Sequence, residues 1–305
     1  MSASTPAPAA AGSNPPEPDQ AARTPLGPFP PGKPETVIRP PKRFAALDLR
    51  EVWKYRDLLV TFVRRDITLR YRQTALGVTW VLLQPLLGAG IFTVVFGLIA
   101  RLPAPEGVPY FLLSYSGLLG WNLFNQSVTR ITTSLTSNAG LISKIYFPRL
   151  IIPISNLGSI LLDFLVALAL MAVLLAANQL VPTWTLALVP AGILVLLMTA
   201  LGIGLWLAAL QVSYRDVGHV TPVLLNLVLY ATPVAYSLAA VPDAVRAFVV
   251  LNPLAGAIET IRMGLLGQTD IPWNLFAVSA VFGLVMFVFG AFQFKRMEHR
   301  FADVI

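Results

Sequence analysis

The side chains that usually carry catalysis are few in this sequence, and they lie far apart. The chain has no cysteine, which excludes thiol catalysis, disulfides and cysteine-based metal sites. Its two histidines, His219 and His299, have no partners at metal-ligand spacing. No GxxxxGKS or GxxxxGKT segment occurs, so the chain has no phosphate-binding loop of that kind for ATP. We therefore expect no catalytic site, no metal and no cofactor in this chain.

One carboxylate, Asp163, lies inside an apolar stretch that is predicted to cross a membrane. An ionisable group in hydrocarbon is costly and by default indicates function. A proton relay needs several such groups in succession, however, and the other predicted spans supply no acid. The pattern therefore favours a hydrogen bond or ion pair of Asp163 that fixes helix packing, over a role in proton transfer.

A second candidate is the polar segment 137–149, which reads SNAGLISKIYFPR. A short helix, the aromatic pair Tyr146-Phe147 and the Pro148-Arg149 stop predict a compact knob that fits a groove on a soluble partner. Composition alone leaves a plain connecting loop equally open.

Residues 50–72 have the periodicity of an amphipathic helix. At 100° per residue one side is apolar, with Val52, Tyr55, Leu58, Leu59, Phe62 and Val63, whereas the opposite side is polar and basic, with Lys54, Asp57, Thr61, Arg64 and Arg65. An ordinary surface helix has the same pattern. Because this segment leads directly into an apolar span, we expect a helix that lies in the lipid headgroup layer.

The elements that position these groups follow from hydropathy. The chain is 56% hydrophobic and only 12% charged, with a mean hydropathy of +0.70, against about 25% charged residues in an ordinary soluble domain. Since about 20 apolar residues cross a bilayer, the sequence predicts an all-α polytopic membrane protein. We place six transmembrane helices near 76–100, 110–133, 150–177, 185–210, 217–237 and 272–294.

The placement of the basic residues sets the expected orientation. With both termini in the cytoplasm, cytoplasmic segments hold 19 of the 22 Lys and Arg residues, and Arg101, Arg246 and Arg262 lie outside. The inverted topology would contradict the positive-inside rule. Because most of these charges flank spans, the net charge of +7 does not indicate nucleic-acid binding.

Three segments lie outside the six spans. Residues 1–45 hold most of a proline-rich run, with 12 of the 25 prolines before residue 42, and are predicted to be a disordered cytoplasmic tail. Residues 295–305 are predicted to be a short cytoplasmic C-terminal tail. Between the last two spans, a short apolar run interrupted by Asn252-Pro253 is too short to cross. It predicts an external re-entrant helical hairpin at 243–266.

Four segments, in this order, resemble a known family. They are RRDITLRYRQTALGVTWVLLQPL at 64–86, SNAGLISKIYFPRLIIP at 137–153, VSYRDVGHVTPVLLNLVLYATPVAY at 212–236 and LNPLAGAIETIRMGLLG at 251–267. The likeness covers roughly residues 50–300. On these motifs the chain resembles the membrane subunits of ABC-2-type exporters of O antigens, capsules and teichoic acids.

The resemblance implies a homodimer around a channel, with two copies of a separate ATPase that binds ATP and Mg²⁺. The domains are then an interfacial gate helix at 46–75, a transmembrane domain at 76–294 with a coupling loop at 137–149, and an external gate hairpin at 243–266. The implied ATPase-contact residues are Asn138, Leu141, Lys144, Tyr146, Phe147 and Arg149. The implied external gate residues are Asn252, Pro253, Glu259 and Arg262.

The resemblance also implies the cargo, a long glycan on a polyprenyl pyrophosphate lipid that leaves through the bacterial cytoplasmic (inner) membrane. Sugar polymers slide on flat aromatic faces. The candidate channel-lining aromatics are Tyr110, Phe111, Tyr115, Trp121, Phe124, Tyr230 and Tyr236, several of which would also suit an interfacial belt. A pyrophosphate would meet arginines where the substrate enters, and the candidates are Arg64, Arg65, Arg70 and Arg72. A positive-inside anchor explains these arginines equally well.

Two other functions remain open from the sequence. One is an ABC-2 exporter of a drug or small lipid, with the same fold and ATPase partner. The other is a membrane enzyme or ATP-independent flippase, which would need intramembrane acids or a catalytic loop that we do not find.

Overall fold

The structure is a computed structural model that describes residues 49–72, 77–144, 147–181, 183–242, 248–298 and 301. The chain divides into two units, Met1–Arg43 and Phe44–Ile305. The first unit, and with it nearly all of the predicted tail at 1–45, lies outside the described residues. So do Tyr146, residues 243–247 of the predicted hairpin and most of the predicted C-terminal tail.

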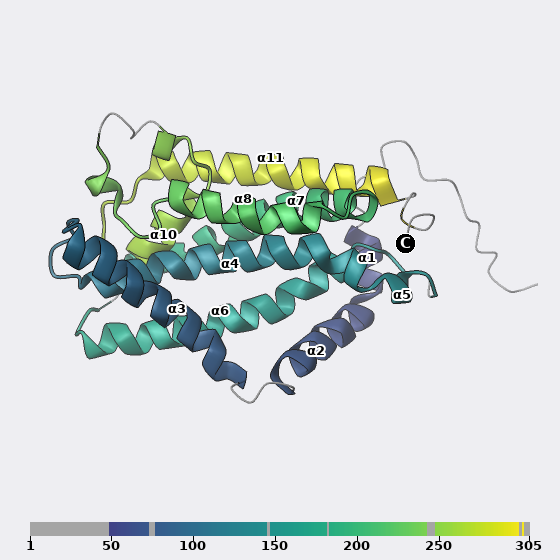
Figure 1. Ribbon diagram of the computed structural model, residues 1–305, viewed down its shortest axis with the longest axis horizontal. Helices are drawn as coiled ribbons and strands as arrows, with labels where there is room; N and C mark the ends of the chain where they lie inside the picture. Colours follow the sequence, from purple (N-terminus) through teal and green to yellow (C-terminus); the bar gives the residue numbers. More distant parts are fainter. Residues whose placement is uncertain are drawn as a thin grey trace, which may run out of the picture. The chain divides into compact units, whose positions relative to one another are not determined.

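The described part of the second unit is helical, and no strand occurs in it (Figure 1). Its elements are α1 (Leu49–Lys54), α2 (Arg56–Arg72), α3 (Gly77–Phe92) continued by the π-helical turn η2 (Thr93–Ile99), α4 (Tyr110–Ser137), α5 (Ala139–Ile142), α6 (Ile151–Ala177), η3 (Trp184–Leu188), α7 (Val189–Ser213), α8 (Val217–Ala231), η4 (Leu238–Ala240), α10 (Ala255–Leu266) and α11 (Trp273–Met297). The predicted all-helical fold is confirmed.

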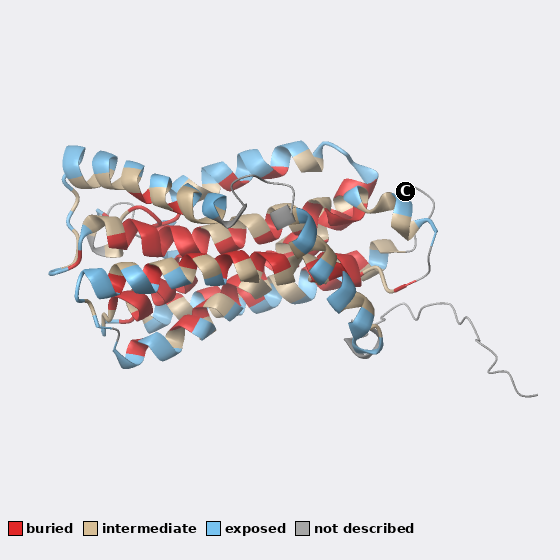
Figure 2. Cartoon of the chain, turned by 90° about the horizontal axis from the view of Figure 1, so that it is seen from below, coloured by how far each residue is buried: buried red, intermediate tan, exposed pale blue. Residues whose placement is uncertain are grey.

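Helices α4 and α7 form the centre of this unit. They pack against each other, and α6 and α11 lie against them on the outside. Figure 2 shows buried residues along the middle of the bundle and exposed residues on the outer helices. Eighteen of the 28 residues of α4 are buried, among them Ser114, Ser116, Ser127, Thr132 and Ser134. Several of these hydroxyls donate to carbonyls of the preceding turn, so they are satisfied without water.

Within the described residues, four stretches are long and apolar enough to cross a membrane: Thr79–Ile99, Ile151–Ala177, Trp184–Ser213 and Trp273–Met297. The two remaining predicted spans form helices with a different character. Helix α4 has ample length but many polar residues, and most of its residues are buried against other helices. Helix α8 is apolar but has only 15 residues, which corresponds to about 22 Å.

The early end of α8 corrects the predicted helix at 217–237. The helix stops at Ala231, and Thr232 is extended, with φ −103° and ψ 138°. The cause is Pro233, because a proline disfavours the helical conformation in the residue before it and has no N–H of its own. The segment 232–237 therefore continues without regular helix, and its carbonyl groups need partners from elsewhere in the protein.

Helices α1 and α2 form the predicted amphipathic segment, interrupted by a turn at Tyr55. Its apolar side packs on protein. Phe62 is buried with Phe147, Ile151 and Ile152, and Val63 rests on Gly158 of α6, where an added Cβ would lie 2.5 Å from the valine Cγ1. That this helix lies in the headgroup layer stays a prediction. Trp53, at the edge of the apolar side, is exposed, as a residue in contact with headgroups would be.

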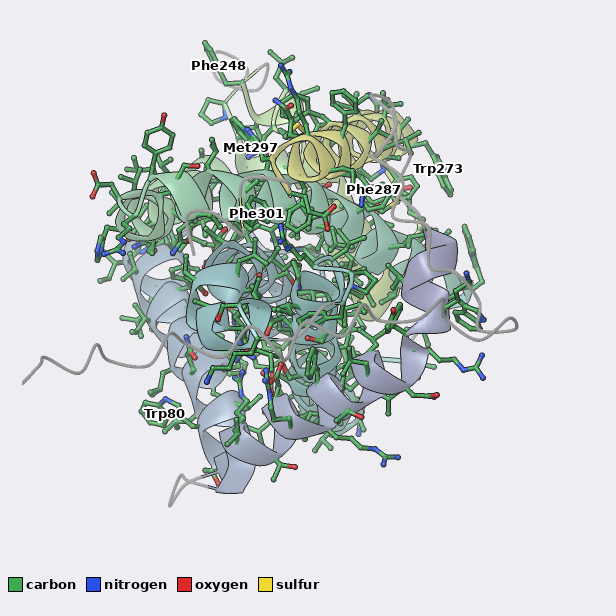
Figure 3. The ribbon with its side chains drawn as sticks, turned by 90° about the vertical axis from the view of Figure 1, so that its right-hand side faces the viewer. Trp80, Phe248, Trp273, Phe287, Met297 and Phe301 are labelled. Carbon is green, nitrogen blue, oxygen red and sulfur yellow. The ribbon has the colours of Figure 1, made fainter. Side chains whose placement is uncertain are left out.

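Figure 3 views the bundle from the end that carries Met297 and Phe301, with Trp80 and Phe248 at its periphery. Both peripheral side chains are exposed. The outer helices thus present large apolar side chains outward, which is the expected arrangement for helices whose solvent is lipid.

Glycines set the spacing between α7 and α11. A Cβ on Gly290 would lie 1.9 Å from the carbonyl oxygen of Gly202, and a Cβ on Gly202 would lie 2.3 Å from the backbone of Met286. Backbone atoms cannot move aside as side chains do. The two helices can approach this closely only with glycine at both positions, the role that small residues commonly have between helices in membranes.

We expect Gly290→Ala to destabilise the protein by about 1–3 kcal/mol, the usual cost of overpacking. Gly90→Ala in α3 is the matched control, because a Cβ there has no neighbour within 4 Å and alanine favours the helix. Thermal unfolding of the detergent-purified variants measures the difference. Equal melting temperatures for the two variants would contradict the close α7–α11 contact.

Candidate functional site

An ion-pair cluster joins three helices at the predicted site of substrate arrival. Nη2 of Arg70 in α2 lies 2.7 Å from Oδ2 of Asp163 in α6, and Nη2 of Arg130 in α4 lies 3.8 Å from the same oxygen. Asp163 is only 2% exposed. Arg130 also donates to Oγ of Ser159 on α6 at 3.1 Å. Because Asp163 is buried, removing its carboxylate would leave Arg70 and Arg130 without this counter-charge. Removing the arginines would leave a buried carboxylate without their compensating charge. The predicted ion pair of Asp163 is confirmed, and the preference for a packing role over proton transfer stays a prediction.

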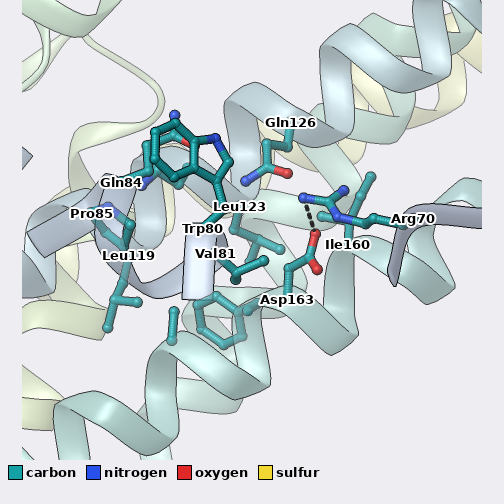
Figure 4. Close-up of a pocket in the computed structure, with 13 residues that line it drawn as sticks. Arg70, Trp80, Val81, Gln84, Pro85, Leu119, Leu123, Gln126, Ile160 and Asp163 are labelled. Atoms are coloured by element: carbon teal, nitrogen blue, oxygen red, sulfur yellow. Dashed lines mark ion pairs between the residues drawn. The ribbon is translucent and has the colours of Figure 1, made fainter. Parts of the chain in front are cut away.

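A cavity of about 470 Å³ opens beside this cluster, between α2, α3, α4 and α6 (Figure 4). Most of its wall consists of aliphatic and aromatic side chains from α3, α4 and α6. Its polar wall is formed by Arg70, Asp163, the indole of Trp80 and the amides of Gln84, Asn122 and Gln126. Figure 4 shows Gln126 near Arg70, with Trp80 and Gln84 on the α3 side. The cavity is therefore amphipathic, with its ionic groups at the α2 side.

The four predicted arginines do not share one environment. Arg64 is exposed, and the side chain of Arg72 lies outside the described residues. Arg65 contacts the predicted coupling loop, where its Nη2 lies 3.1 Å from Oδ1 of Asn138, and it also pairs with Asp66 at 2.9 Å. Arg70 belongs to the Asp163 cluster. Their role in binding substrate stays a prediction, and the structure adds a second role for two of them, which is to hold α2 in place.

The segment 137–149 has a buried base and an exposed tip. Phe147 is buried, and its ring meets that of Phe62 edge to face, with 5.8 Å between centroids. Leu141 packs partly buried against the same cluster, whereas Lys144 is exposed. This arrangement agrees with a knob that is held by the protein and presents its tip outward. Tyr146 lies outside the described residues.

Arg149 connects the knob to the end of the chain. Its Nη1 donates to the carbonyl of Glu298, and its guanidinium lies over the ring of Phe301 with 5.8 Å to the centroid. The knob is thus attached to α2 through Arg65 and Phe62, and to the end of α11 through Arg149.

On the opposite end of the bundle, Arg262 of α10 binds the non-helical segment that follows α8. The guanidinium donates to the carbonyls of Pro233, Val234 and Tyr236 at 2.6, 2.8 and 3.1 Å, and to Oε2 of Glu259 at 2.6 Å. Arg262 is 0% exposed and Glu259 is 1% exposed. Arg262 therefore satisfies carbonyls that would otherwise lack partners in hydrocarbon, and Glu259 compensates its charge.

Asn252 caps the same segment from the other side. Its Nδ2 donates to the carbonyl of Ala231 at 3.0 Å and to Oγ1 of Thr232 at 2.8 Å, while its Oδ1 accepts from the N–H of Leu254 at 3.0 Å. The four predicted gate residues thus gather around the end of α8, with Pro253 following Asn252 in the turn. They hold the segment 232–237, and their role as a gate stays a prediction.

The predicted channel-lining aromatics do not share one environment, although Phe111 contacts Tyr115 and Trp121 contacts Phe124, with 6.3 and 5.8 Å between ring centroids. Tyr115 and Trp121 are buried within the helical core, at 0% and 2% exposure, and have no surface on which a polymer could stack. Phe124 borders a separate apolar cavity between α4, α7 and α8. Tyr230 is 71% exposed. Tyr110, Phe111 and Tyr236 are half-buried, so a channel role stays a prediction for these and Tyr230.

Sequence reasoning missed the amides of the cavity. A signal was present, because Asn122 and Gln126 lie four residues apart in a predicted span, and Gln84 follows Trp80 by four in another. Residues at this spacing share a helix face. A hydropathy value is an average over a window of residues, so two polar side chains on one face of an apolar helix do not stand out in it.

Replacing Arg262 with methionine should lower the free energy of unfolding by about 3–5 kcal/mol, because Glu259 is left as a buried unpaired acid. The double variant Arg262→Met/Glu259→Gln should recover part of this loss, since glutamine is neutral. Arg215→Met, at an exposed arginine, is the control. Thermal unfolding of the purified proteins measures the stability of all three variants. If Arg262→Met were as stable as wild type, the buried Arg262–Glu259 ion pair would not have the stabilising role given to it.

Comparison with known proteins now places the chain. Residues 57–266 match the ABC-2 type transporter family. The chain is 32% identical over 261 residues to the O-antigen export system permease protein RfbA of Myxococcus xanthus. The aligned region covers 84% of this chain and 98% of that protein. It is 28% identical over 253 residues to RfbA of Klebsiella pneumoniae, covering 82% and 95%. It is 26% identical over 213 residues to the polysialic acid transport protein KpsM of Escherichia coli, covering 65% and 77%. The chain belongs to the ABC-2 type transporter family.

Proposed function

We propose that this chain is the permease subunit of an ATP-driven exporter that moves a polyprenyl-pyrophosphate-linked polysaccharide to the outer face of the membrane. The observation that carries the proposal is the similarity to an O-antigen export permease along 98% of that protein's length. Similarity to a second type of polysaccharide permease supports the same substrate class. An exporter of a drug or small lipid would share the family, and the experiment below separates the two.

Membership of the family implies a partner ABC ATPase. We propose a homodimer of this chain with two ATPase copies docked at the 137–149 knob. The exposed Lys144 on a buried base supports this assignment. ATP and Mg²⁺ are then bound by the ATPase, and this chain contributes the path and the docking surface.

The contacts of α2 suggest how ATPase movement reaches the membrane domain. The Arg65–Asn138 hydrogen bond and the Phe62–Phe147 contact tie α2 to the knob. The Arg70–Asp163 ion pair ties the C-terminal end of α2 to α6 beside the cavity. A displacement of the knob would therefore tilt α2 and change access to the cavity. In this mechanism Arg65 and Arg70 act as positioning residues.

The central experiment deletes the gene in its own host and measures surface polysaccharide by labelling intact cells. We expect the deletion strain to lose surface polysaccharide and to accumulate the lipid-linked form inside, and the wild-type gene to restore export. Lys144→Glu should bind the ATPase less and export less while it inserts normally, because the exposed tip then carries the opposite charge.

Two controls complete this experiment. Arg215→Glu reverses charge at another exposed basic residue outside the knob and should leave ATPase binding unchanged if docking is confined to 137–149. A deletion strain with normal surface polysaccharide would contradict the proposed function. Normal ATPase binding by Lys144→Glu would contradict only the docking site.

The orientation can be measured directly because the chain has no cysteine. Single cysteines at Glu106, Ser143 and Thr269 occupy exposed positions in three different connections. With both termini in the cytoplasm, a membrane-impermeant maleimide should label positions 106 and 269 in intact cells, and position 143 only after lysis. Labelling of position 143 from outside would overturn the proposed topology.

A further inference from the structure

We propose that the cavity between α2, α3, α4 and α6 is a saccharide-binding site, in which the amides of Gln84, Asn122 and Gln126 bind sugar hydroxyls and the indole of Trp80 stacks on a sugar face. This inference rests on the proposed function, because it names the part of the polysaccharide substrate that this cavity holds.

The first observation is the state of the three amides. All three line the cavity, and none of their side chains forms a hydrogen bond with the part of the chain that the structure describes. Gln84 is exposed, and Asn122 and Gln126 are half-buried. Elsewhere in the bundle Thr132 and both Nη atoms of Arg262 are hydrogen-bonded within the protein, whereas buried hydroxyls such as Ser114 and Ser127 have no hydrogen-bond partner among the described residues. A polar group left without a partner at membrane depth is costly. Amides that face a cavity are therefore available to a ligand that offers hydrogen bonds.

The second observation is the chemistry of the wall. A primary amide offers both a donor and an acceptor, which matches a hydroxyl group that also donates and accepts. A hydrocarbon chain would leave the amides unsatisfied. A phosphate only accepts, whereas this wall also presents amide oxygens and the carboxylate of Asp163, whose Oδ2 lies 2.7 Å from Arg70. The wall therefore favours an uncharged, hydroxyl-rich ligand.

The third observation is geometric. Asn122 and Gln126 are four residues apart on α4, and Trp80 and Gln84 are four residues apart on α3, so the two helices each direct two of these residues to the same cavity. Trp80 is 56% exposed, which leaves its ring free for stacking. The volume of about 470 Å³ lies within the usual range of small-molecule sites, roughly 300–1,000 Å³. It holds a short saccharide and not a long stretch of polymer.

The depth of the cavity along α4 suits a site that is filled at the beginning of transport. Gln126 lies eleven residues before the end of α4 at Ser137, which is about 16 Å along the helix axis. In the proposed topology this is the cytoplasmic half of the membrane, beside the α2 segment that the knob moves. We infer that the cavity holds the first sugars next to the lipid while the rest of the glycan has not yet entered the path.

The test uses variants that keep shape and remove hydrogen bonding: Asn122→Leu and Gln126→Met. Asn125→Leu is the matched control, because Asn125 lies on the same helix, is absent from the cavity wall and instead accepts a hydrogen bond from Thr129. Trp80→Phe should retain stacking and Trp80→Leu should lose it. Each gene is placed in the deletion strain, and ATPase binding is measured to establish that the variant assembles.

Two quantities are measured. One is the rate at which polysaccharide reaches the cell surface. The other is the affinity of the purified permease–ATPase complex, in lipid nanodiscs, for the host's own polysaccharide after release from its lipid by mild acid. We expect each amide variant to lose about tenfold or more in affinity and to export more slowly, with Asn125→Leu close to wild type. Trp80→Phe should lose less affinity than Trp80→Leu, because a smaller aromatic ring still stacks.

The outcomes separate the two proposals. Wild-type binding and export by Asn122→Leu and Gln126→Met would overturn the saccharide site and leave the proposed function intact. Tighter binding of lipid by these apolar variants, without loss of glycan affinity, would likewise overturn it in favour of a lipid-filled cavity. Failure of the wild-type gene to restore surface polysaccharide would overturn the proposed function, and the saccharide site with it.

Discussion

A polar group in hydrocarbon has no water to bind, so it must find its partner inside the protein. Much of this bundle follows from that constraint. The polar helix α4 lies at the centre, where the hydroxyls of Ser116, Thr132 and Ser134 donate to carbonyls of its own preceding turn. Asp163, buried on α6, is met by arginines from two other helices. Where the helix α8 is broken by Pro233, Arg262 and Asn252 supply the donors that the freed carbonyls lack.

The same constraint draws attention to polar groups that have no partner inside the protein. Three amides face a cavity without a hydrogen bond to the described protein, and all three remain accessible to a ligand because none of them is buried. Glycines serve a related purpose at Gly117, where a Cβ would lie 2.3 Å from the carbonyl of Val234 and 2.6 Å from Nη2 of Arg262. A larger residue there would displace the segment that Arg262 holds.

Two arginines of α2 have both a predicted role in membrane orientation and contacts that hold the helix in the fold. In the predicted topology Arg65 and Arg70 contribute to the positive-inside asymmetry whatever their side chains contact. In the fold they also connect α2 to Asn138 and to Asp163. The helix that the sequence indicated for the headgroup layer is therefore joined to the knob near its middle, through Phe62 and Arg65, and to the cavity near its C-terminal end, through Arg70. A docked ATPase could act through it.

Local pattern was sufficient for much of the fold. The apolar stretches at 150–177 and 272–294 became α6 and α11 almost to the residue, because hydropathy and helix formation depend on neighbours within a few turns. Only the tertiary structure decided which residues meet. Hydropathy does not distinguish an apolar residue that faces lipid from one that faces another helix, so the burial of Tyr115 and Trp121 was not predictable from it. The pairing of Arg70 with Asp163, and the gathering of Trp80, Gln84, Asn122 and Gln126 around one cavity, join residues far apart in the chain. Such contacts arise only when helices pack, because packing sets the distances between side chains that the linear order leaves free.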